Sequence, residues 1–586
     1  MEVAFEVEHP GHGARAGMDG VIVMTGIPMD AQVDVAALDA AVGKVRAGLP
    51  SWVGLPVEEK AGLVHRLRRR FGDEVPGMVE AWRLAQGLES DSFWIGDVWA
   101  GESGVPILVR GWESTLTRLA RGDRLVAPKA VSRDALGQVT VDVFPASRAD
   151  RLLYGGCSGR VRLEPGTTAA EVATCGAALA SGEFPDAGVA LLLAAGNFDC
   201  LPGSDALGLL LGHGCTVVMK LNPVNAYLRP SLERLFVEFI DAGWLAIVEG
   251  GPEVGAYLAH HQDVDRVHLT GSAATYNALV WGTGPDAERR RASGQRLLDK
   301  PFTAELGGVN PLIVAPGRWT RHDLRRQADR IAYGRLCNSG HFCAATQILV
   351  LPDGWDQADQ LLDDLRGILR TLEPRTPYYP GTDARVARAL ADQDHVEALS
   401  PDGRRFLVTG LDPDRDCSLF HDEVFADVLG VVRLPAPDVE SYLTRAVGFA
   451  NEALAGSLGA TLLVDPGTEA HHRPAVTNAV AGLCYGFVGI NEHAGFTAAA
   501  PQLLWGAYPG NTPEDIGSGV GFTFNTLMLP RPEQSVLRAA FRTPIKSLFT
   551  ATHKTRGPVF KAYMDWAASG DNPRKLPHIV LPALRG

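Results

Sequence analysis

The residues best suited to covalent chemistry are a cysteine and a glutamate that each lie beside glycines. Cys343 ends the segment NSGHFC (338–343), between a helix predicted over 324–336 and a strand predicted over 346–351. Backbone N–H groups in such a turn can lower the pKa of a thiol and stabilise an oxyanion. Taken alone, however, a cysteine is more often a small buried apolar residue.

Three further polar residues follow or end predicted strands. Glu305 precedes Gly307-Gly308 and could act as a general base, or it could be a solvated residue at a strand end. Asn197 could donate an amide N–H to an oxyanion, or it could simply form a turn after glycine. Lys220 could bind ribose hydroxyls or phosphate, or it could extend into solvent.

Other patterns are weaker. The segment GGPEVG (250–255) is a glycine-rich turn without the GxGxxG spacing of a phosphate loop. His260-His261, with Asp263 and Asp265, could suggest a metal, but adjacent residues do not share a helix face. A surface loop is therefore favoured there, and the sequence predicts no metal site.

The elements that position these residues alternate between strands and helices. Buried apolar runs at 189–195, 215–221, 245–248 and 264–269 are separated by helix-like segments. This alternation predicts a parallel, doubly wound sheet, in which ligands bind at the carboxyl ends of the strands. Those ends carry small or polar residues: Gly196-Asn197, Lys220, Gly250-Gly251 and Gly271-Ser272.

The flanking regions have other patterns. The spacing of apolar residues predicts amphipathic helices over 33–48 and 57–75. Alternating residues at 137–144, with 160–163 as a partner, predict a β-hairpin or flap. A second strand-and-helix region follows over 310–464. The charged segment 285–300 is predicted to be a surface insertion, and the last sixty or so residues an irregular tail.

Composition limits the class of protein. The chain has 586 residues, 46% of them hydrophobic, which is ordinary globular usage and excludes general disorder, collagen and a disulfide scaffold. The net charge of −13 argues against sequence-independent nucleic-acid binding, so Arg66, Arg68, Arg69 and Arg70 are interpreted as a solvated helix face.

The sequence also indicates the cellular compartment of the protein. Eight scattered cysteines without a CxxC pair predict a reduced, cytoplasmic protein. The N-terminus lacks the pattern of a signal peptide, and no apolar run is long enough to span a bilayer.

Taken in order, several motifs resemble the NAD(P)-dependent aldehyde dehydrogenase superfamily over about residues 30–525. They are Asn197-Phe198, Val217 to Lys220, Gly250 to Gly255, Leu269 to Ser272, Glu305 to Gly308 with Asn310-Pro311, Gly340 to Ala345, Glu423 to Phe425, and Asn451 with Gly456 and Leu458.

The resemblance implies an α/β fold with a Rossmann-type doubly wound cofactor domain, an α/β catalytic domain and a small β-flap. It places the cofactor domain in 1–137 and 166–309, and the catalytic domain in 310–525. The flap and tail would then be 138–165 and 526–586. It also implies a homodimer or homotetramer.

The resemblance also implies roles for single residues in oxidising an aldehyde to an acid. Cys343 would be the nucleophile, Glu305 the base that activates water, and Asn197 an oxyanion donor. NAD or NADP would be held by Lys220, Gly251, Gly255, Gly271, Ser272, Glu423 and Phe425.

The sequence departs from the family pattern at several positions. Ala195-Gly196 replaces Pro-Trp before the asparagine, and Tyr276 replaces a glycine after the phosphate turn. Pro223 stands where a carboxylate would disfavour a 2′-phosphate, which keeps NADP open. The glutamate–phenylalanine motif continues as Ala426-Asp427.

Two alternatives follow from these departures. A CoA-acylating dehydrogenase or acyl-thioester reductase is opposed by Glu305, because acylating relatives typically lack that base. A non-catalytic scaffold or binding relative is supported by Tyr276 and by the altered motif at Glu423 to Asp427. It is opposed by Cys343, Glu305 and Asn197 together. The aromatics Tyr485, Phe487, Phe496, Trp505, Tyr508, Phe522 and Phe524 could line an apolar tunnel, but core packing is the favoured interpretation.

Overall fold

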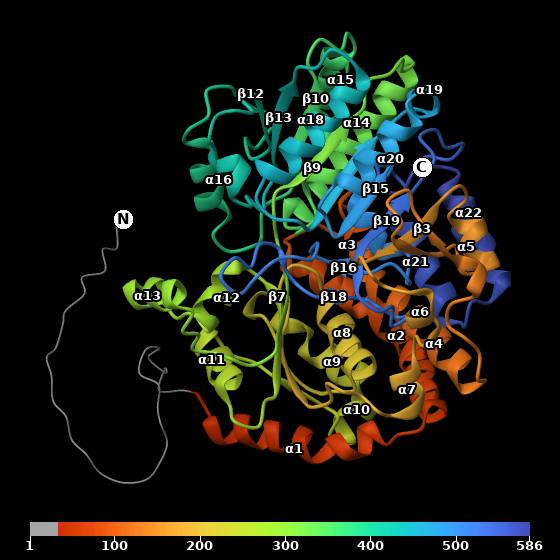
Figure 1. Ribbon diagram of the computed structural model, residues 1–586, viewed down its shortest axis with the longest axis vertical. Coiled ribbons are helices and arrows are strands. Elements are labelled where there is room, and N and C mark those ends of the chain that lie inside the picture. The colour runs from red at the N-terminus through yellow and green to blue at the C-terminus, as the bar shows by residue number, and fades with distance from the viewer. Residues whose placement is uncertain (1–32) are drawn as a thin grey trace, which may run out of the picture.

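The computed structural model describes residues 33–586, apart from the side chains at 497–499. Two large sheets with helices packed on them form the body of the molecule (Figure 1). The N-terminal segment, which was predicted not to be a signal peptide, lies outside the described residues.

The first sheet has six strands in the order β17-β8-β7-β4-β5-β6. Five are parallel, and β17 (Gly519–Val520) is antiparallel to β8. The parallel strands end in register, since Leu193 pairs with both Lys220 and Leu269. The predicted doubly wound sheet is therefore confirmed. Its parallel strands are β4 (Val189–Leu193), β5 (Thr216–Lys220), β6 (Leu245–Val248), β7 (Arg266–Gly271) and β8 (Phe302–Leu306).

Helices connect these strands as the apolar pattern predicts. The connections are α8 (Cys200–Leu207), α9 (Arg229–Leu235), α10 (Val237–Asp241), α11 (Pro252–His260) and α12 (Ala273–Val280). The helical segment between β5 and β6 is interrupted at Phe236, whose backbone leaves the helical region.

The second sheet has eleven strands in the order β1-β2-β3-β19-β15-β14-β9-β10-β13-β12-β11. Its central seven strands are parallel, and the edges are antiparallel. The strands are β1 (Val131–Arg133), β2 (Val139–Phe144), β3 (Ser158–Leu163), β9 (Asn310–Val314), β10 (Thr346–Pro352), β11 (Val396–Ala398), β12 (Phe406–Leu411), β13 (Val428–Leu434), β14 (Gly459–Leu463), β15 (Phe487–Ile490) and β19 (Pro532–Arg538).

The predicted hairpin forms from β2 and β3, and β19 joins it to this sheet. Between β9 and β10 runs α14 (Arg321–Leu336), the helix that leads to Cys343. The prediction of a helix, a turn and a strand around this cysteine is confirmed.

The N-terminal helices cover the first sheet and lie beside the second. They are α1 (Val35–Val53), α2 (Val57–Ala85), α3 (Ile95–Glu102) and α4 (Gly104–Ala120). Figure 1 shows α1 along the bottom of the view, and this helix packs on β4, β5 and β6. Its buried residues Val42, Val45 and Trp52 recur at three- and seven-residue spacing, the pattern that predicts this helix.

The C-terminal tail is more regular than predicted. The interpretation of an irregular tail is wrong over α21 (Arg556–Ala568) and α22 (Leu576–Ala583). Helix α21 buries Val559, Tyr563 and Trp566 at helical spacing and packs against α3 and α2. That spacing was present in the sequence among many glycines and prolines.

The interpretation of Arg68, on α2, also needs correction. It was interpreted as part of a solvated face, but its side chain is buried and donates to the Ala567 carbonyl at 2.5 Å. It also pairs with Asp571 and Glu113. The arginine therefore anchors the tail to the N-terminal helices.

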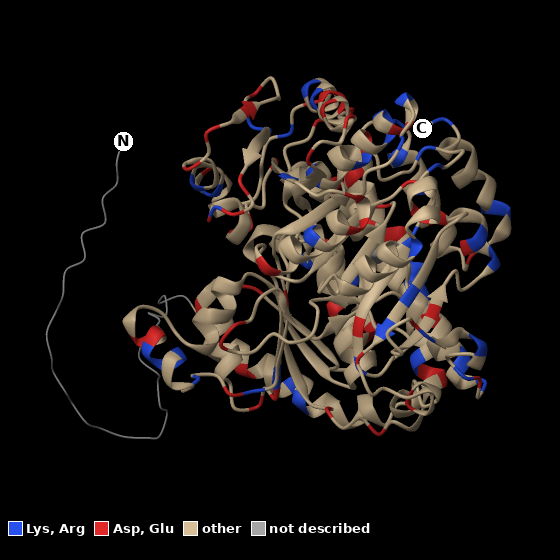
Figure 2. Ribbon diagram, turned by 45° about the horizontal axis from the view of Figure 1, so that its top comes forward, with Lys and Arg blue, Asp and Glu red and all other residues tan. Residues whose placement is uncertain are grey.

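The charged segment after β7 forms a surface helix, α13 (Pro285–Ser293), with no buried residue. Figure 1 shows it projecting from the body, and Figure 2 shows both signs of charge along it. The surface location is as predicted. Within residues 33–586, no helix combines the length and apolar character needed to cross a membrane.

Candidate active site

The turn that carries Cys343 has an unusual backbone. After α14, the short 3-10 helix η4 (Cys337–Gly340) places Asn338 and Ser339 at φ 52° and 54°. Residues with side chains rarely adopt this left-handed region, so the surrounding structure must hold them there.

A buried ion pair provides part of that hold. The Asp97 carboxylate on α3 accepts from the Asn338 N–H at 2.7 Å, from the Tyr333 hydroxyl at 3.0 Å and from Arg375 at 2.6 Å. The side chains of Asp97 and Arg375 are each 2% exposed. Burial acts to raise the pKa of Asp97, but the charge of Arg375 holds that pKa below its usual value.

Asn310, the first residue of β9, holds the other side of the turn. Its Nδ2 donates to the Cys343 carbonyl at 2.6 Å, and its Oδ1 accepts from the Gly459 N–H at 3.0 Å. Sequence reasoning assigned no role to Asn310, Asn338 or Asp97. The available signals were that Asn310 belongs to the motif Asn310-Pro311 and is a polar residue that opens an apolar strand.

The environment of Cys343 differs from the expectation that turn N–H groups lower its pKa. Burial and the charges of Glu305 and Glu423 raise the pKa of the thiol well above its ordinary value, and the Ala344 N–H only partly offsets this. The turn by itself does not supply a thiolate. A nearby base must therefore take the proton.

Glu305 on β8 is placed to be that base. The interaction between Glu305 and the Cys343 thiol acts to lower the pKa of the carboxyl and to raise that of the thiol. The Trp505 indole N–H donates to Glu305 Oε1 at 3.0 Å. Burial raises the pKa of Glu305 to about 7, against the opposing effects of Trp505 and Cys343. A carboxyl with such a pKa suits proton transfer near neutral pH.

Asn197 lies directly behind the catalytic turn. Its Nδ2 donates to the His341 carbonyl at 3.1 Å, and its own carbonyl accepts from Asn338 at 2.7 Å and from the Tyr378 hydroxyl at 2.9 Å. The contact to His341 uses one of the two amide N–H groups. Asn197 does not line the cavity described next, so its role as an oxyanion donor stays a prediction.

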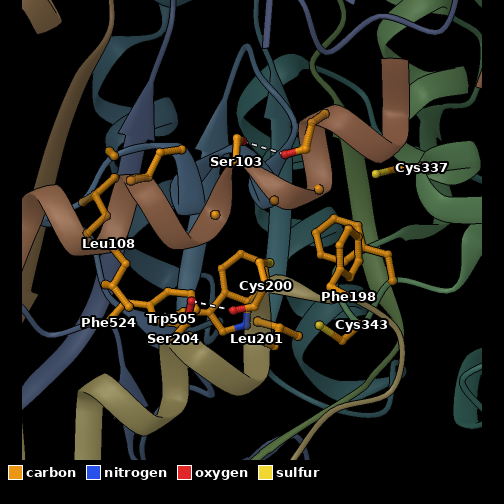
Figure 3. Close-up of a pocket in the computed structure, with 18 of the residues that line it drawn as sticks. Ser103, Leu108, Phe198, Cys200, Leu201, Ser204, Cys337, Cys343, Trp505 and Phe524 are labelled. Atoms are coloured by element: carbon orange, nitrogen blue, oxygen red, sulfur yellow. Dashed lines mark hydrogen bonds between the residues drawn. The ribbon is translucent and has the colours of Figure 1, made fainter. Parts of the chain in front are cut away.

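One cavity contains both Cys343 and Glu305. Figure 3 shows Leu108, Phe198, Trp505 and Phe524 among the residues that line this cavity together with Cys343. Of the seven aromatic residues considered for a tunnel, Trp505 and Phe524 line it, and Phe487 stacks on Trp505 with ring centres 4.1 Å apart. The tunnel interpretation therefore holds for Trp505 and Phe524, and the core interpretation holds for Phe487.

The carboxyl edge of the first sheet carries the predicted cofactor residues. Lys220 ends β5, where burial lowers the pKa of its ammonium group. Gly251 precedes α11, and its N–H donates to Glu253 at 3.0 Å. Gly255 faces Leu193 closely enough that a Cβ would lie 3.4 Å from it, so α11 packs tightly on β4.

The second helix at this edge begins after Gly271 and Ser272. Ser272 caps α12 by accepting from the Thr275 N–H at 3.2 Å. Helices α11 and α12 thus both begin at the same edge of the sheet. Because helix N-termini bind phosphate groups, this arrangement suits a pyrophosphate. Tyr276 is buried in the core against Phe302, so the tyrosine points away from this edge.

Glu423 and Phe425 lie between the cofactor edge and the catalytic turn. Burial raises the pKa of Glu423 to about 8, and its Oε1 is buried without a hydrogen-bond partner among residues 33–586. A Cβ at Gly307 would collide with this carboxylate, so the glycine makes room for it. An unpartnered carboxyl oxygen here fits a sugar hydroxyl donor, and the site as a whole fits a dinucleotide.

The fold and site define a doubly wound α/β protein with a cysteine and a glutamate beside a dinucleotide-binding edge. The model of the aldehyde dehydrogenase family matches residues 183–438. The N-succinylglutamate 5-semialdehyde dehydrogenase of Chromobacterium violaceum is 25% identical over 445 residues, which are 73% of this chain and 76% of that protein.

A plant relative matches over a shorter stretch. The peroxisomal aminoaldehyde dehydrogenase 2 of Pisum sativum is 26% identical over 301 residues, 47% of this chain and 54% of that protein.

A solved structure agrees in fold. The gamma-glutamyl-gamma-aminobutyraldehyde dehydrogenase of Burkholderia cenocepacia has a TM-score of 0.59 at 20% identity, over 86% of this chain and 88% of that one. These matches support membership of the aldehyde dehydrogenase superfamily, as predicted. The predicted fold class is confirmed, while the roles of single residues stay predictions.

Proposed function

We propose that this protein oxidises an aldehyde to a carboxylic acid with NAD or NADP, through a thioester on Cys343. The observation that carries the proposal is the placement of Cys343 and Glu305 in one cavity, with Glu305 held by Trp505. Membership of the aldehyde dehydrogenase superfamily supports the same reaction.

The first step is activation of the nucleophile. The pKa of Glu305 is about 7 and that of the Cys343 thiol is raised, so Glu305 accepts the thiol proton as the sulfur attacks. A bond forms between Sγ and the aldehyde carbon, and the carbonyl oxygen becomes an oxyanion. The free amide N–H of Asn197 and the Cys343 backbone N–H are the proposed donors to that oxygen.

The cofactor, when bound, supplies the hydride acceptor that converts this adduct to a thioester. Lys220, Ser272 and Glu423 would hold its sugar and phosphate groups, with the N-termini of α11 and α12 directed at the phosphates. Phe425, with its ring 5.1 Å from that of Tyr379, would pack beside the nicotinamide.

Hydrolysis completes the cycle. Glu305 releases the thiol proton to solvent and, again ionised, takes a proton from water as the water oxygen attacks the thioester carbon. The bond between carbon and Sγ then breaks, the carboxylic acid leaves, and the sulfur regains a proton from Glu305. Trp505 keeps the Glu305 carboxylate oriented during both proton transfers.

The test follows absorbance of the reduced nicotinamide. Purified protein is mixed with NAD or NADP and aldehydes, without CoA. We expect reduced cofactor to form with the unmodified protein and with Cys200→Ala, a control cysteine on the same cavity, but not with Cys343→Ala. Turnover that appears only after CoA is added would favour the acylating alternative. A folded protein that is inactive under both conditions would favour the non-catalytic one.

We also propose a cytoplasmic homodimer or homotetramer. All eight cysteines are free thiols, which supports a reducing compartment. β1 is an edge strand of the eleven-stranded sheet, with Ser132 and Arg133 exposed, and it offers an edge for pairing between subunits. Light scattering that gives a mass near 62.6 kDa would contradict the oligomer. Cell fractionation checks the compartment.

A further inference from the structure

The cavity beside Cys343 offers no charged partner to a substrate. Among the described residues that line it, Glu305 is the only Asp, Glu, Lys or Arg, and it lies at the reacting end with Cys343. His493 also lines the cavity, but burial lowers its pKa to about 4, so it is neutral near pH 7. Moving a carboxylate or ammonium group out of water without a partner is costly.

The rest of the lining is rich in aromatic rings. The Phe342 ring lies 5.2 Å from that of Phe198 and 5.9 Å from that of Trp505. Phe524 extends the set beyond Trp505, with ring centres 6.5 Å apart. Ile107, Leu108 and Leu201 add aliphatic surface. Such a wall favours an apolar group over a charged one.

A separate part of the wall comes from the C-terminal tail. Phe549 lines the cavity, and its ring neighbours are Phe496 at 4.3 Å and Tyr333 at 5.8 Å. Cys343 packs instead against the cluster that contains Phe487 and Trp505, which does not include Phe549. Phe549 therefore lies against a different part of the cavity wall from the reacting end.

The loop that carries Phe549 is firmly attached. Asp329 on α14 accepts from the Thr552 N–H at 2.9 Å, and its carbonyl accepts from the Ala551 N–H at 3.0 Å. The Ser547 hydroxyl donates to Glu492 at 2.7 Å. Since both ends of the loop are bonded to elements that also line the cavity, the tail is a fixed part of its wall.

We propose that the site takes an uncharged, apolar aldehyde, and that Phe549 packs against the part of it remote from the carbonyl. This inference rests on the proposed function, because it names the class of aldehyde that the reaction uses. It differs from what the names of the bacterial relatives imply for them, since a succinylglutamate semialdehyde carries carboxylates.

The first experiment compares aldehydes of similar length. Hexanal and phenylacetaldehyde represent the apolar class, glutaric semialdehyde the anionic class and 4-aminobutanal the cationic class. We expect kcat/KM for the apolar pair to exceed that of the charged pair by about 100-fold or more. A preference for a charged aldehyde would overturn the inference and leave the proposed function intact.

A binding measurement separates the inference from the proposed function. Alkylation of Cys343 by iodoacetamide is followed by mass spectrometry in the presence of hexanamide or of succinamate, which are not oxidised. We expect protection by hexanamide only. If no aldehyde is oxidised but hexanamide alone protects, the proposed function fails and the apolar site stands. Equal or preferred protection by succinamate contradicts the apolar site.

The second experiment tests the tail residue. Phe549→Ala is expected to lower kcat/KM for phenylacetaldehyde about tenfold and to leave that for acetaldehyde within about twofold. Leu548→Ala, on the same loop but outside the lining, is the control and should change neither. Phe549→Leu, which retains apolar bulk, serves if the alanine variant does not fold. An equal loss for both aldehydes would show a purely structural role for Phe549.

Discussion

The catalytic turn and the cofactor edge of this protein are held in place in different ways. The turn at Asn338 and Ser339 has a left-handed backbone and is fixed by Asp97 and by Asn310 farther along, with partners from several distant segments. Ser272, at the cofactor edge, is exposed and bonded to Thr275 three residues away. The nucleophile therefore depends on tertiary packing, whereas the phosphate turn depends on local capping.

This difference explains where the sequence departs from its family. Tyr276 is accommodated because the helix that Ser272 caps turns the tyrosine into the core. A comparable change within the network of Asp97, Asn338 and Arg375 would leave a buried polar group unpaired. Substitutions should thus have larger effects at the catalytic turn than at the cofactor edge.

The largest effect is expected for Glu305→Gln, which removes the base from the catalytic cavity. The steady-state rate should fall by about 10²- to 10⁴-fold, the range for loss of a general base. Stopped-flow absorbance of the reduced nicotinamide checks this. Glu288→Gln on the exposed helix α13 is the control. A rate unchanged by Glu305→Gln would remove this residue from the mechanism.

Asp97→Ala should follow in size. It leaves the Arg375 guanidinium buried without its partner and the Asn338 N–H without an acceptor, at a cost of about 3–5 kcal/mol in the free energy of unfolding. Urea unfolding measures the change. Asp363→Ala removes an exposed partner of Arg366 and should cost less than about 1 kcal/mol. Similar costs for the two variants would contradict the buried network.

A smaller change is expected for Trp505→Phe, which retains a stacking ring and removes the N–H donor to Glu305. The pKa of Glu305 is about 7 and should rise by about one unit, the size of a hydrogen bond to a charged group. Because the base acts when ionised, the rate falls as pH drops through this pKa, and that limb should move to higher pH.

The pH dependence of kcat/KM for the wild type and for Trp505→Phe measures this shift. Trp355→Phe, which removes an indole N–H bonded to the Gly317 carbonyl, is the control. An unshifted acidic limb in Trp505→Phe would mean that the indole does not influence the base.

The smallest effect is expected for Ser272→Ala at the cofactor edge. Loss of the cap should cost about 1 kcal/mol in the free energy of unfolding. Loss of the hydroxyl at the proposed phosphate site should weaken the binding of NADH or NADPH a few-fold. Fluorescence titration of the reduced cofactor measures it, with Ser272→Thr as the variant that keeps the cap. If Ser272→Ala lowered the free energy of unfolding in urea as much as Asp97→Ala does, the proposed difference between the two regions would be contradicted.

Much of the fold could be predicted from local patterns. The apolar runs at 189–195 and 215–221 became β4 and β5, because buried parallel strands require continuous apolar residues. Helix α21 was missed, although Val559, Tyr563 and Trp566 have helical spacing, because glycine and proline nearby favoured an irregular interpretation. The solvated interpretation of Arg68 was also wrong, since its partner Asp571 lies about 500 residues away in sequence.

The candidate site divides in the same way. Residue types and their order were enough to propose Cys343, Glu305 and the cofactor residues. They could not show that burial and two carboxylates raise the pKa of the Cys343 thiol, or that Trp505 rather than another aromatic holds Glu305. These properties depend on which side chains meet in space.

The sequence by itself determined the alternation of strands and helices, the family, and the cysteine and glutamate of the proposed reaction, because these follow from local periodicity and from short motifs. Only the tertiary structure decided how the nucleophile is held, what raises its pKa, and that the C-terminal tail contributes Phe549 to the cavity wall. The physical reason is that burial and hydrogen bonding depend on contacts between segments far apart in the chain, which local patterns do not encode.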